Sequence, residues 1–200
     1  MIEWFTDIDR AILFAINSWH PPLLDWLMWE ITGKYLAAIF YLSLAYLIYK
    51  KFGRKALIPI IMAVALFTIT DQTTGIVKKL TKRERPTHNI VIANKIQTVM
   101  GEEGGQYGFF SSHAANSFCM CTFSFLLLRR RLKGMGWIFF FAALHSLSRV
   151  YMGLHYPSDI LVGAIYGSLW GWLGFAAIKR YVQFVPIQVR EGRAERGEEK

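Results

Sequence analysis

The chain has 200 residues, of which 54% are hydrophobic, 16% aromatic and 18% charged, and its formal net charge is +9. This composition is too apolar for an ordinary soluble domain of this length, so it indicates an integral membrane protein. The positive charge does not indicate a nucleic-acid partner, because the basic residues stand in short clusters between apolar runs, as they do in multispanning membrane proteins.

The N-terminal region predicts two short helices rather than a cleavable signal peptide. Charged residues between positions 7 and 10 interrupt the first apolar stretch, so a clean signal-peptide core is missing. The segment from Ile8 to Trp19 is short and is closed by a His-Pro-Pro sequence, so it either spans the membrane obliquely or lies in the interface. The stretch from Leu23 to Ile31, with Trp26 and Trp29, is typical of an interfacial amphipathic helix.

Five later stretches have the length or character of membrane helices. They cover about residues 35–49, 56–77, 113–128, 136–150 and 158–178. With the first segment, they predict an all-α fold, a polytopic membrane helix bundle of about six transmembrane helices. We expect one membrane domain over residues 1–189 and a charged, disordered cytoplasmic tail over residues 190–200.

The loop charges predict the orientation of this bundle. Lysines and arginines cluster at residues 50–55, 129–133 and 179–180, and these clusters fall on one side if the five clear helices alternate. The positive-inside rule makes that side cytoplasmic. An even number of spans would also put the N-terminus inside. We expect a bacterial inner (plasma) membrane protein whose site faces the periplasm or the exterior.

Three ordered blocks of polar residues lie at the helix ends on the other side. They read Lys78-x6-Arg85-Pro86, Ser111-Ser112-His113 and Ser148-Arg149-x5-His155-x3-Asp159. Cations, hydroxyls, two imidazoles and one carboxylate are therefore expected on one membrane face. This combination indicates a site that handles phosphate.

One part of these blocks suits phosphate binding. A phosphoryl group in transfer spreads negative charge over its equatorial oxygens and needs fixed donors around them. Lys78, Arg85 and Arg149 supply cationic donors, and the arginines allow bidentate contacts. Ser111 precedes an apolar helix, so its hydroxyl, the amide of Ser112 and the next amide can form an anion site at a helix N-terminus.

The remaining residues suit nucleophilic catalysis. Pro157 is typical of a first helical position, which puts Asp159 in the first turn, within reach of His155. The carboxylate would keep one nitrogen of His155 protonated and direct the other as a nucleophile. His113 then serves as the acid that protonates the leaving oxygen and as the base that activates water.

The three blocks resemble the signature blocks of the type 2 phosphatidic acid phosphatase superfamily, which also includes vanadium-dependent haloperoxidases. The resemblance covers about residues 78–159 and implies the membrane lipid phosphatase branch. It implies that His155 is the nucleophile, Asp159 its orienting carboxylate and His113 the acid. The Lys, the two Arg and the Ser of the blocks would hold phosphate without metal or cofactor.

One departure concerns the second block. The family usually has Pro-Ser-Gly-His there, whereas this chain has Phe110-Ser111-Ser112-His113. If the glycine acts through its amide at negative φ, Ser112 can replace it. If positive φ is required, Ser112 costs about 1 kcal/mol or more.

We therefore expect a hydrolase that removes phosphate from a monoester or diphosphate of a membrane lipid through a phosphohistidine. Candidate substrates are undecaprenyl diphosphate, phosphatidylglycerol phosphate, phosphatidic acid and lipid A phosphates. The additional cations Lys79, Lys82 and Arg83 favour a head group with more than one phosphate. The rival hypothesis is a noncatalytic anion or lipid transporter, and a haloperoxidase fits less well because it has no use for the membrane helices. No obligatory protein partner is indicated.

Other polar residues have structural alternatives. Asp71 shares a helix face with Lys78, so it either supports the cationic site through an ion pair or hydrogen bond, or is exposed at the helix end. His145 shares a face with Arg149 and is either a hydrogen-bonded core histidine or a support for the site. His88 is expected to be solvated in a loop. The two cysteines are two positions apart in a helical run, so neither a disulfide nor a metal pair is expected.

Overall fold

A computed structural model describes residues 2–183, so the predicted tail lies outside the described residues. This part of the chain is helical, and between residues 2 and 183 the only β-type pairing is an isolated bridge between Glu84 and Tyr107. The α-helices are α1 (Ile2–Ile16), α2 (Pro22–Thr32), α3 (Lys34–Phe52), α4 (Leu57–Thr81), α5 (Ser112–Leu128), α6 (Ile138–Tyr151) and α7 (Pro157–Gln183). The all-α prediction is confirmed.

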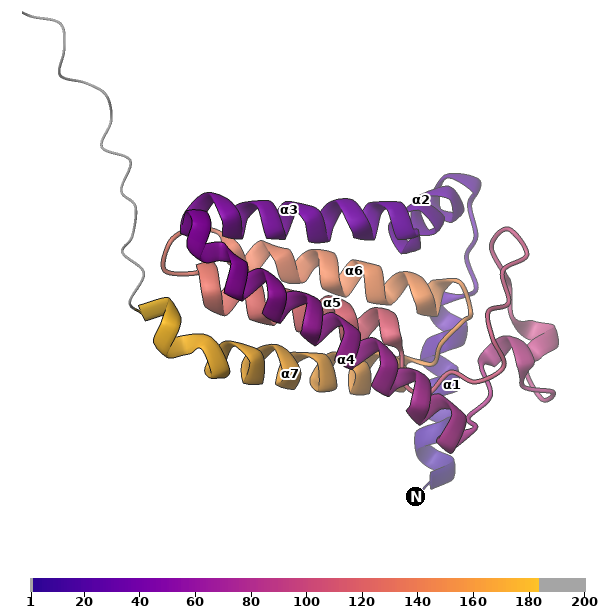
Figure 1. The fold of residues 1–200 in the computed structure, drawn as a ribbon. Coiled ribbons are helices and arrows are strands. Elements are labelled where there is room, and N and C mark those ends of the chain that lie inside the picture. Colours follow the sequence, from indigo (N-terminus) through magenta and orange to yellow (C-terminus); the bar gives the residue numbers. More distant parts are fainter. Residues whose placement is uncertain (1, 184–200) are drawn as a thin grey trace, which may run out of the picture.

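The five predicted apolar stretches correspond to helices α3 to α7, which run along the bundle (Figure 1). Helix α5 lies among them and contacts each of the other four. The segments Lys34–Thr81, which holds α3 and α4, and Pro157–Gln183 are long and apolar enough to cross a membrane. Large apolar side chains such as Leu42, Ile61 and Leu161 are exposed on their outer faces. A lipid environment accounts for this exposure.

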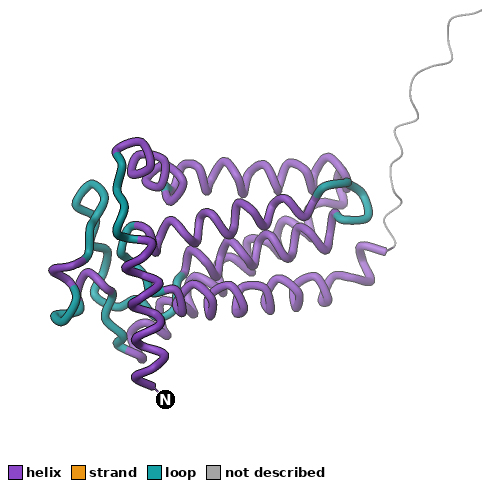
Figure 2. Tube along the Cα trace, turned by 180° about the vertical axis from the view of Figure 1, so that it is seen from behind, coloured by secondary structure: helices purple, strands orange, loops and turns teal. Residues whose placement is uncertain are grey.

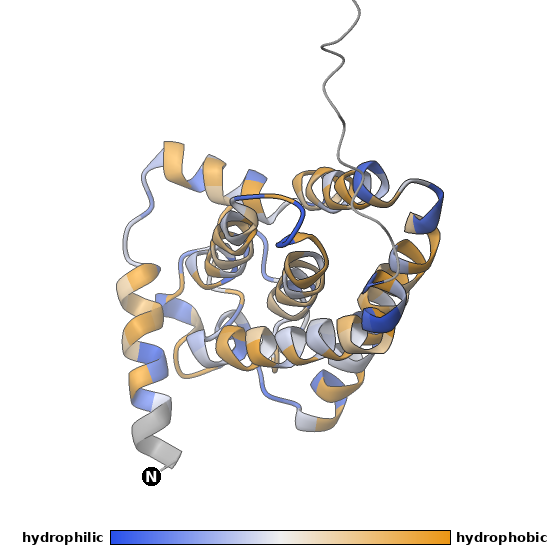
Figure 3. Ribbon diagram, turned by 90° about the vertical axis from the view of Figure 1, so that its left-hand side faces the viewer, coloured by the Kyte–Doolittle hydropathy of each residue, from blue (hydrophilic) through white to orange (hydrophobic). Residues whose placement is uncertain are grey.

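Helices α1 and α2 lie across one end of the bundle, roughly perpendicular to its long helices (Figures 1 and 3). Of the two placements expected for the first segment, the crosswise course of α1 fits the interfacial one, and its placement in the membrane stays a prediction. Helix α2 matches the predicted amphipathic helix, and its Trp26 is exposed. The long connection from residue 82 to residue 111 lies at the same end (Figure 2).

A row of glycines brings α7 against α5. Gly163, Gly167 and Gly171 are four residues apart, and a Cβ at Gly167 would lie 2.0 Å from the carbonyl oxygen of Ala115. No larger residue fits at that distance, so the two backbones approach as in other small-residue helix contacts. The close approach places the N-termini of α5 and α7 side by side. The amide of Ser111 accordingly donates to the carbonyl oxygen of Asp159 at 3.1 Å.

The basic clusters lie at the opposite end. Residues 50–55 cover the end of α3 and the turn that leads into α4, and residues 129–133 form the turn between α5 and α6 (Figure 1). The alternation expected from the loop charges is thus present in the bundle. Which end faces the cytoplasm remains a prediction.

Candidate active site

All three sequence blocks meet at the end of the bundle where α1 and α2 lie. The last turn of α4, the first turns of α5 and α7, the last turn of α6 and two connecting segments each bring part of the predicted set. The residues brought together are Lys78, Arg85, Ser111, Ser112, His113, Arg149, His155 and Asp159. The antiparallel course of the helices explains how blocks far apart in sequence share one site.

His155 and Asp159 form a buried pair. Nδ1 of His155 lies 3.3 Å from Oδ2 of Asp159, and the same oxygen accepts a hydrogen bond from the amide of Tyr156 at 3.1 Å. Both side chains are buried. With Nδ1 as the donor to the carboxylate, Nε2 is the nitrogen left for chemistry.

The surroundings of His155 keep its imidazole neutral. Burial lowers the pKa of His155 well below its usual value, and the nearby cations Arg85, Arg149 and Lys78 lower it further. A neutral imidazole is the form that can attack phosphorus. This electrostatic setting agrees with the role that the resemblance implies for His155.

Gly108 covers the pair. A Cβ at this position would lie 3.3 Å from Oδ2 of Asp159 and 3.5 Å from Nδ1 of His155. The backbone of residue 108 therefore lies against both side chains. In the sequence, the only signal for this glycine is its place in a glycine-rich stretch close before the second block.

The two arginines of the blocks are buried with part of their hydrogen-bonding capacity unused. Arg85 is 9% exposed and Arg149 is 8% exposed. Arg85 donates from Nε to the carbonyl oxygen of Tyr107 at 3.3 Å, and Arg149 donates from Nη1 to Oγ1 of Thr32 at 2.9 Å. Nη1 of Arg85 and Nε of Arg149 are buried without a protein partner. Two buried like charges with free donors are the arrangement that an oxyanion would stabilise.

The second block begins α5. Ser111 is the N-cap, and its hydroxyl accepts a long hydrogen bond of 3.4 Å from the amide of Ala114. Ser112 is the first helical residue, and among the described non-glycine residues only Lys82 and Met100 have positive φ. The departure from the family's glycine therefore imposes no backbone strain at Ser112. Its hydroxyl also accepts a hydrogen bond from Nζ of Lys78 at 2.6 Å.

His113 lies on the side of the site nearest α6. Its ring centre is 5.1 Å from that of His145, and it interacts electrostatically with Arg149, His155 and Lys78. His113 is partly exposed, whereas His155 is buried. This difference suits a residue that exchanges protons with a leaving group and then with water.

Asp71, His145 and His88, for which the sequence left structural alternatives, each have a side-chain partner. Asp71 accepts a hydrogen bond from Nδ2 of Asn116 at 3.2 Å and is partly buried, so it is not simply exposed at the helix end, and its support of the cationic site stays a prediction. His145 is buried, with Nδ1 2.8 Å from Oγ of Ser117. It is thus a hydrogen-bonded core histidine that also packs beside His113. His88 is partly buried rather than fully solvated, with Nδ1 3.1 Å from Oγ1 of Thr87.

Arg83 has partners that the sequence did not predict. We predicted that it would add positive charge for a second phosphate, and the structure instead pairs its guanidinium with two carboxylates. Nη1 donates to Oδ1 of Asp159 and Nη2 donates to Oδ2 of Asp9, each at 2.6 Å. A guanidinium held by two carboxylates does not present these N–H groups to a second phosphate, so the structure does not support the expected contribution of Arg83. Lys79 and Lys82 are exposed.

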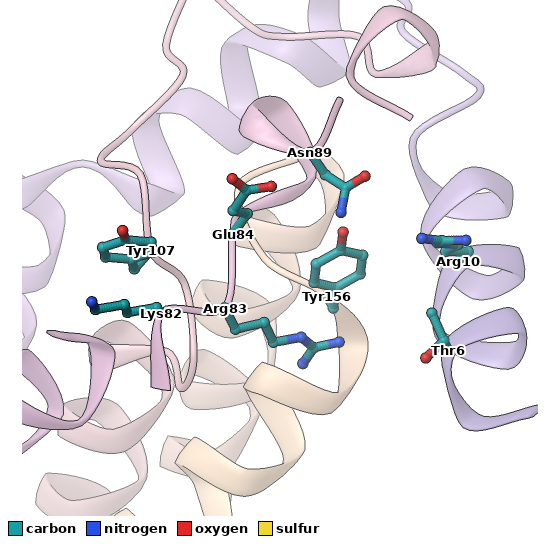
Figure 4. A pocket seen from close by; sticks show the side chains of 8 residues that line it. All are labelled: Thr6, Arg10, Lys82, Arg83, Glu84, Asn89, Tyr107 and Tyr156. Atoms are coloured by element: carbon teal, nitrogen blue, oxygen red, sulfur yellow. The ribbon is translucent and has the colours of Figure 1, made fainter. Parts of the chain in front are cut away.

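A cavity of about 390 Å³ lies beside this ion pair, between α1, the connection after α4 and the start of α7 (Figure 4). Its lining is polar and includes Thr6, Arg10, Lys82, Arg83, Glu84, Asn89, Tyr107 and Tyr156. Of the eight predicted site residues, none lines this cavity.

The donor chemistry of the described residues offers no metal cage. Among residues 2–183, no three His, Cys, Asp or Glu side chains form a group that could hold a metal ion. Cys119 and Cys121 are both buried and unpaired, as expected.

Comparisons with known proteins agree with the three blocks. The model of the family described as the PAP2 superfamily matches residues 55–183. The chain is 39% identical over 176 residues to the Lipid A 4'-phosphatase of Bacteroides thetaiotaomicron, covering 86% of this chain and 78% of that protein. It is 31% identical over 173 residues to the Lipid A 4'-phosphatase of Porphyromonas gingivalis, covering 85% of this chain and 72% of that protein.

Two solved structures share the fold. Aquifex aeolicus LpxE gives a TM-score of 0.62 at 22% identity, with 84% of this chain and 94% of that chain covered. The first transmembrane PAP2-type phosphatidylglycerolphosphate phosphatase from Bacillus subtilis gives a TM-score of 0.69 at 20% identity, with 90% of this chain and 89% of that chain covered.

Proposed function

The chain belongs to the PAP2 superfamily, as its three blocks predicted, and from this premise we propose that its substrate is a phosphorylated glycolipid of the lipid A type. The protein is an integral membrane lipid phosphatase. The choice among the four candidate lipids is supported by the two Lipid A 4'-phosphatases, each similar to this chain over most of its length.

The observation that carries the mechanism is the His155–Asp159 pair beside three cationic side chains. Lys78, Arg85 and Arg149 bind the non-bridging oxygens of the phosphate. Nε2 of His155 attacks phosphorus, and the bond from phosphorus to the sugar oxygen breaks. His113 gives its proton to that oxygen, so the dephosphorylated lipid leaves as an alcohol.

The second half of the reaction regenerates the enzyme. His113, now neutral, takes a proton from water, and the water oxygen attacks the phosphohistidine. The bond between phosphorus and Nε2 breaks, inorganic phosphate forms, and both imidazoles return to their starting states. Ser111 and Ser112 contribute the start of α5 as an additional donor site for the phosphate oxygens.

The face of the membrane is part of the proposal. The site lies one helix length away from the basic turns at residues 50–55 and 129–133, so the positive-inside rule supports a periplasmic or extracellular site in a bacterial inner membrane. Single cysteines at the exposed positions Asn94 and Lys133, in a variant without Cys119 and Cys121, test this. An impermeant reagent on cells with a permeabilised outer membrane should label position 94 and spare position 133. The reverse pattern would place the site in the cytoplasm.

A release assay tests the substrate. The purified protein should liberate phosphate from bis-phosphorylated lipid A faster than from phosphatidic acid, phosphatidylglycerol phosphate or undecaprenyl diphosphate. Mass spectrometry of the product then identifies which sugar has lost its phosphate. Turnover of the other lipids without turnover of lipid A would overturn the substrate proposal. Binding of these lipids with no release of phosphate would support the transporter hypothesis instead.

A further inference from the structure

Arg83 connects the nucleophile's carboxylate to helix α1. Its Nη1 donates to Oδ1 of Asp159 at 2.6 Å and to Oγ of Ser158 at 2.8 Å, while Nη2 donates to Oδ2 of Asp9 at 2.6 Å. The guanidinium also lies over the ring of Tyr156, 4.3 Å from its centre. Figure 4 shows the Arg83 side chain beside Tyr156 and extended toward α1. A planar guanidinium that is bonded to carboxylates on both sides and packed against a ring has little freedom to move.

Asp9 fixes the other end of this connection. It is a buried carboxylate in α1, 6% exposed. Its Oδ1 accepts from the amide of Ser158 at 2.8 Å, and its Oδ2 accepts from the Ser158 hydroxyl as well as from Arg83. An acidic side chain from another helix thus caps the start of α7, where the helix dipole favours negative charge. Through these contacts α1 is tied to the turn that carries His155 and Asp159.

The two oxygens of Asp159 have separate partners. Oδ1 accepts from Arg83, while Oδ2 accepts from the amide of Tyr156 and faces Nδ1 of His155. With Oδ1 held, the carboxylate cannot rotate to offer its other oxygen or turn away from the imidazole. The orientation of the His155 imidazole therefore depends on the position of the Arg83 guanidinium, and Asp9 fixes that position.

We propose that Asp9 and Arg83 are positioning residues, which act through Asp159 to hold His155 in line for attack on phosphorus. This inference rests on the proposed phosphohistidine mechanism. It assigns a function in the reaction to α1, a helix outside residues 55–183, where the family model matches. Neither residue touches the phosphate in this scheme, and both act on the rate of the chemical step rather than on substrate affinity.

Asp9→Asn is the first test variant, because asparagine keeps the size and one acceptor oxygen while it removes the charge that holds Arg83. We expect kcat to fall about 10- to 100-fold, since small displacements of a reacting group have effects of this size. KM for the lipid should change less than about twofold, because the phosphate ligands are untouched. Asp7→Asn is the matched control, since Asp7 is exposed on the same helix and loses the same charge.

Arg83 provides a readout that a purely structural role would not affect. The charged and titratable groups facing His155 are Lys78 from α4, Arg83 and Arg85 from the connection after α4, Arg149 from α6, His113 from α5 and Asp159 from α7. Arg83→Ala removes one of these cations, so the pKa of His155 should rise and the acidic limb of kcat/KM should move to higher pH. Asp9→Asn removes an anion, so this limb should not move upward.

Chemical rescue separates positioning from folding. The cavity of about 390 Å³ is lined by Arg83, so a small guanidinium cation can reach the space that Arg83→Ala leaves. Millimolar methylguanidinium should restore part of kcat in a saturable way, whereas sodium chloride at equal ionic strength should not. Arg83→Lys, which keeps the charge but lacks the fork, should retain more activity than Arg83→Ala.

The experiment uses the full-length protein in detergent, with melting temperatures recorded for each variant. Unchanged kcat in Asp9→Asn, a loss confined to KM, or a loss that follows lower melting temperature with no rescue in Arg83→Ala would overturn the inference. Each of these outcomes requires that the wild-type protein turns over the lipid. If the wild-type protein releases no phosphate and forms no phosphohistidine, the proposed function itself fails.

Discussion

The two ends of the bundle are both basic, yet they carry their positive charge in different ways. At the end with the short turns, Lys50, Arg129 and Arg130 are exposed to solvent. At the other end, Arg85 and Arg149 are buried and retain N–H groups without protein acceptors. Exposed charge of the first kind is typical of loops that set topology. Burial of convergent charge of the second kind costs free energy unless an anion binds to it. Only the second end therefore indicates a functional site.

The largest effect is expected from the nucleophile. His155→Ala should lower kcat about 10⁴-fold or more, because the covalent intermediate can no longer form. Phosphate release measures the loss, and acid-quenched mass spectrometry of the wild-type protein should find the phosphoryl group on His155. His88→Ala, at the partly buried histidine of the connection, is the control and should stay near wild type. Full activity in His155→Ala would contradict the mechanism.

Substitution of one arginine from each end tests directly whether the two ends differ in function. Arg149→Ala should lower kcat/KM about 100- to 1000-fold, the usual consequence of losing one fixed donor to a developing oxyanion. Arg130→Ala removes the same charge from an exposed turn and should leave kcat/KM unchanged. Equal effects of the two substitutions would show that burial and convergence do not distinguish the ends.

Much of this arrangement could be predicted from the sequence, for reasons that individual residues make clear. Long apolar runs predicted helices α3 to α7, and fixed block spacing singled out the eight residues that the structure brings together at one end of the bundle. The four-residue spacing of Gly163, Gly167 and Gly171 is a further sequence signal, typical of a close contact between two helices. The contact between Asp9 and Arg83 could not be predicted. These residues are 74 positions apart, and they meet because α1 crosses the end of the bundle.

A smaller effect is expected at Ser112. Its φ is not positive, so glycine and serine both fit the first position of α5. Ser112→Gly loses the hydroxyl that accepts from Lys78, a contact of about 0.5–1.5 kcal/mol, so kcat/KM should fall by no more than about tenfold. The same release assay measures this change. A loss as large as that of Arg149→Ala would mean that the Ser112 hydroxyl itself binds phosphate.

Removal of divalent metal is expected to leave the activity unchanged, which is the smallest effect of the series. Lys78, Arg85 and Arg149 already bring positive charge to one place, and a dication added there would be repelled by them. The transferred phosphate can be neutralised by these side chains alone, which is the function that a metal has in other phosphoryl-transfer enzymes. Phosphate release in EDTA should therefore equal release in buffer, while vanadate, which imitates five-coordinate phosphorus, should inhibit. Loss of activity in EDTA that returns only with a divalent ion would assign part of the charge at this end to a metal, and would remove the distinction drawn between the two ends.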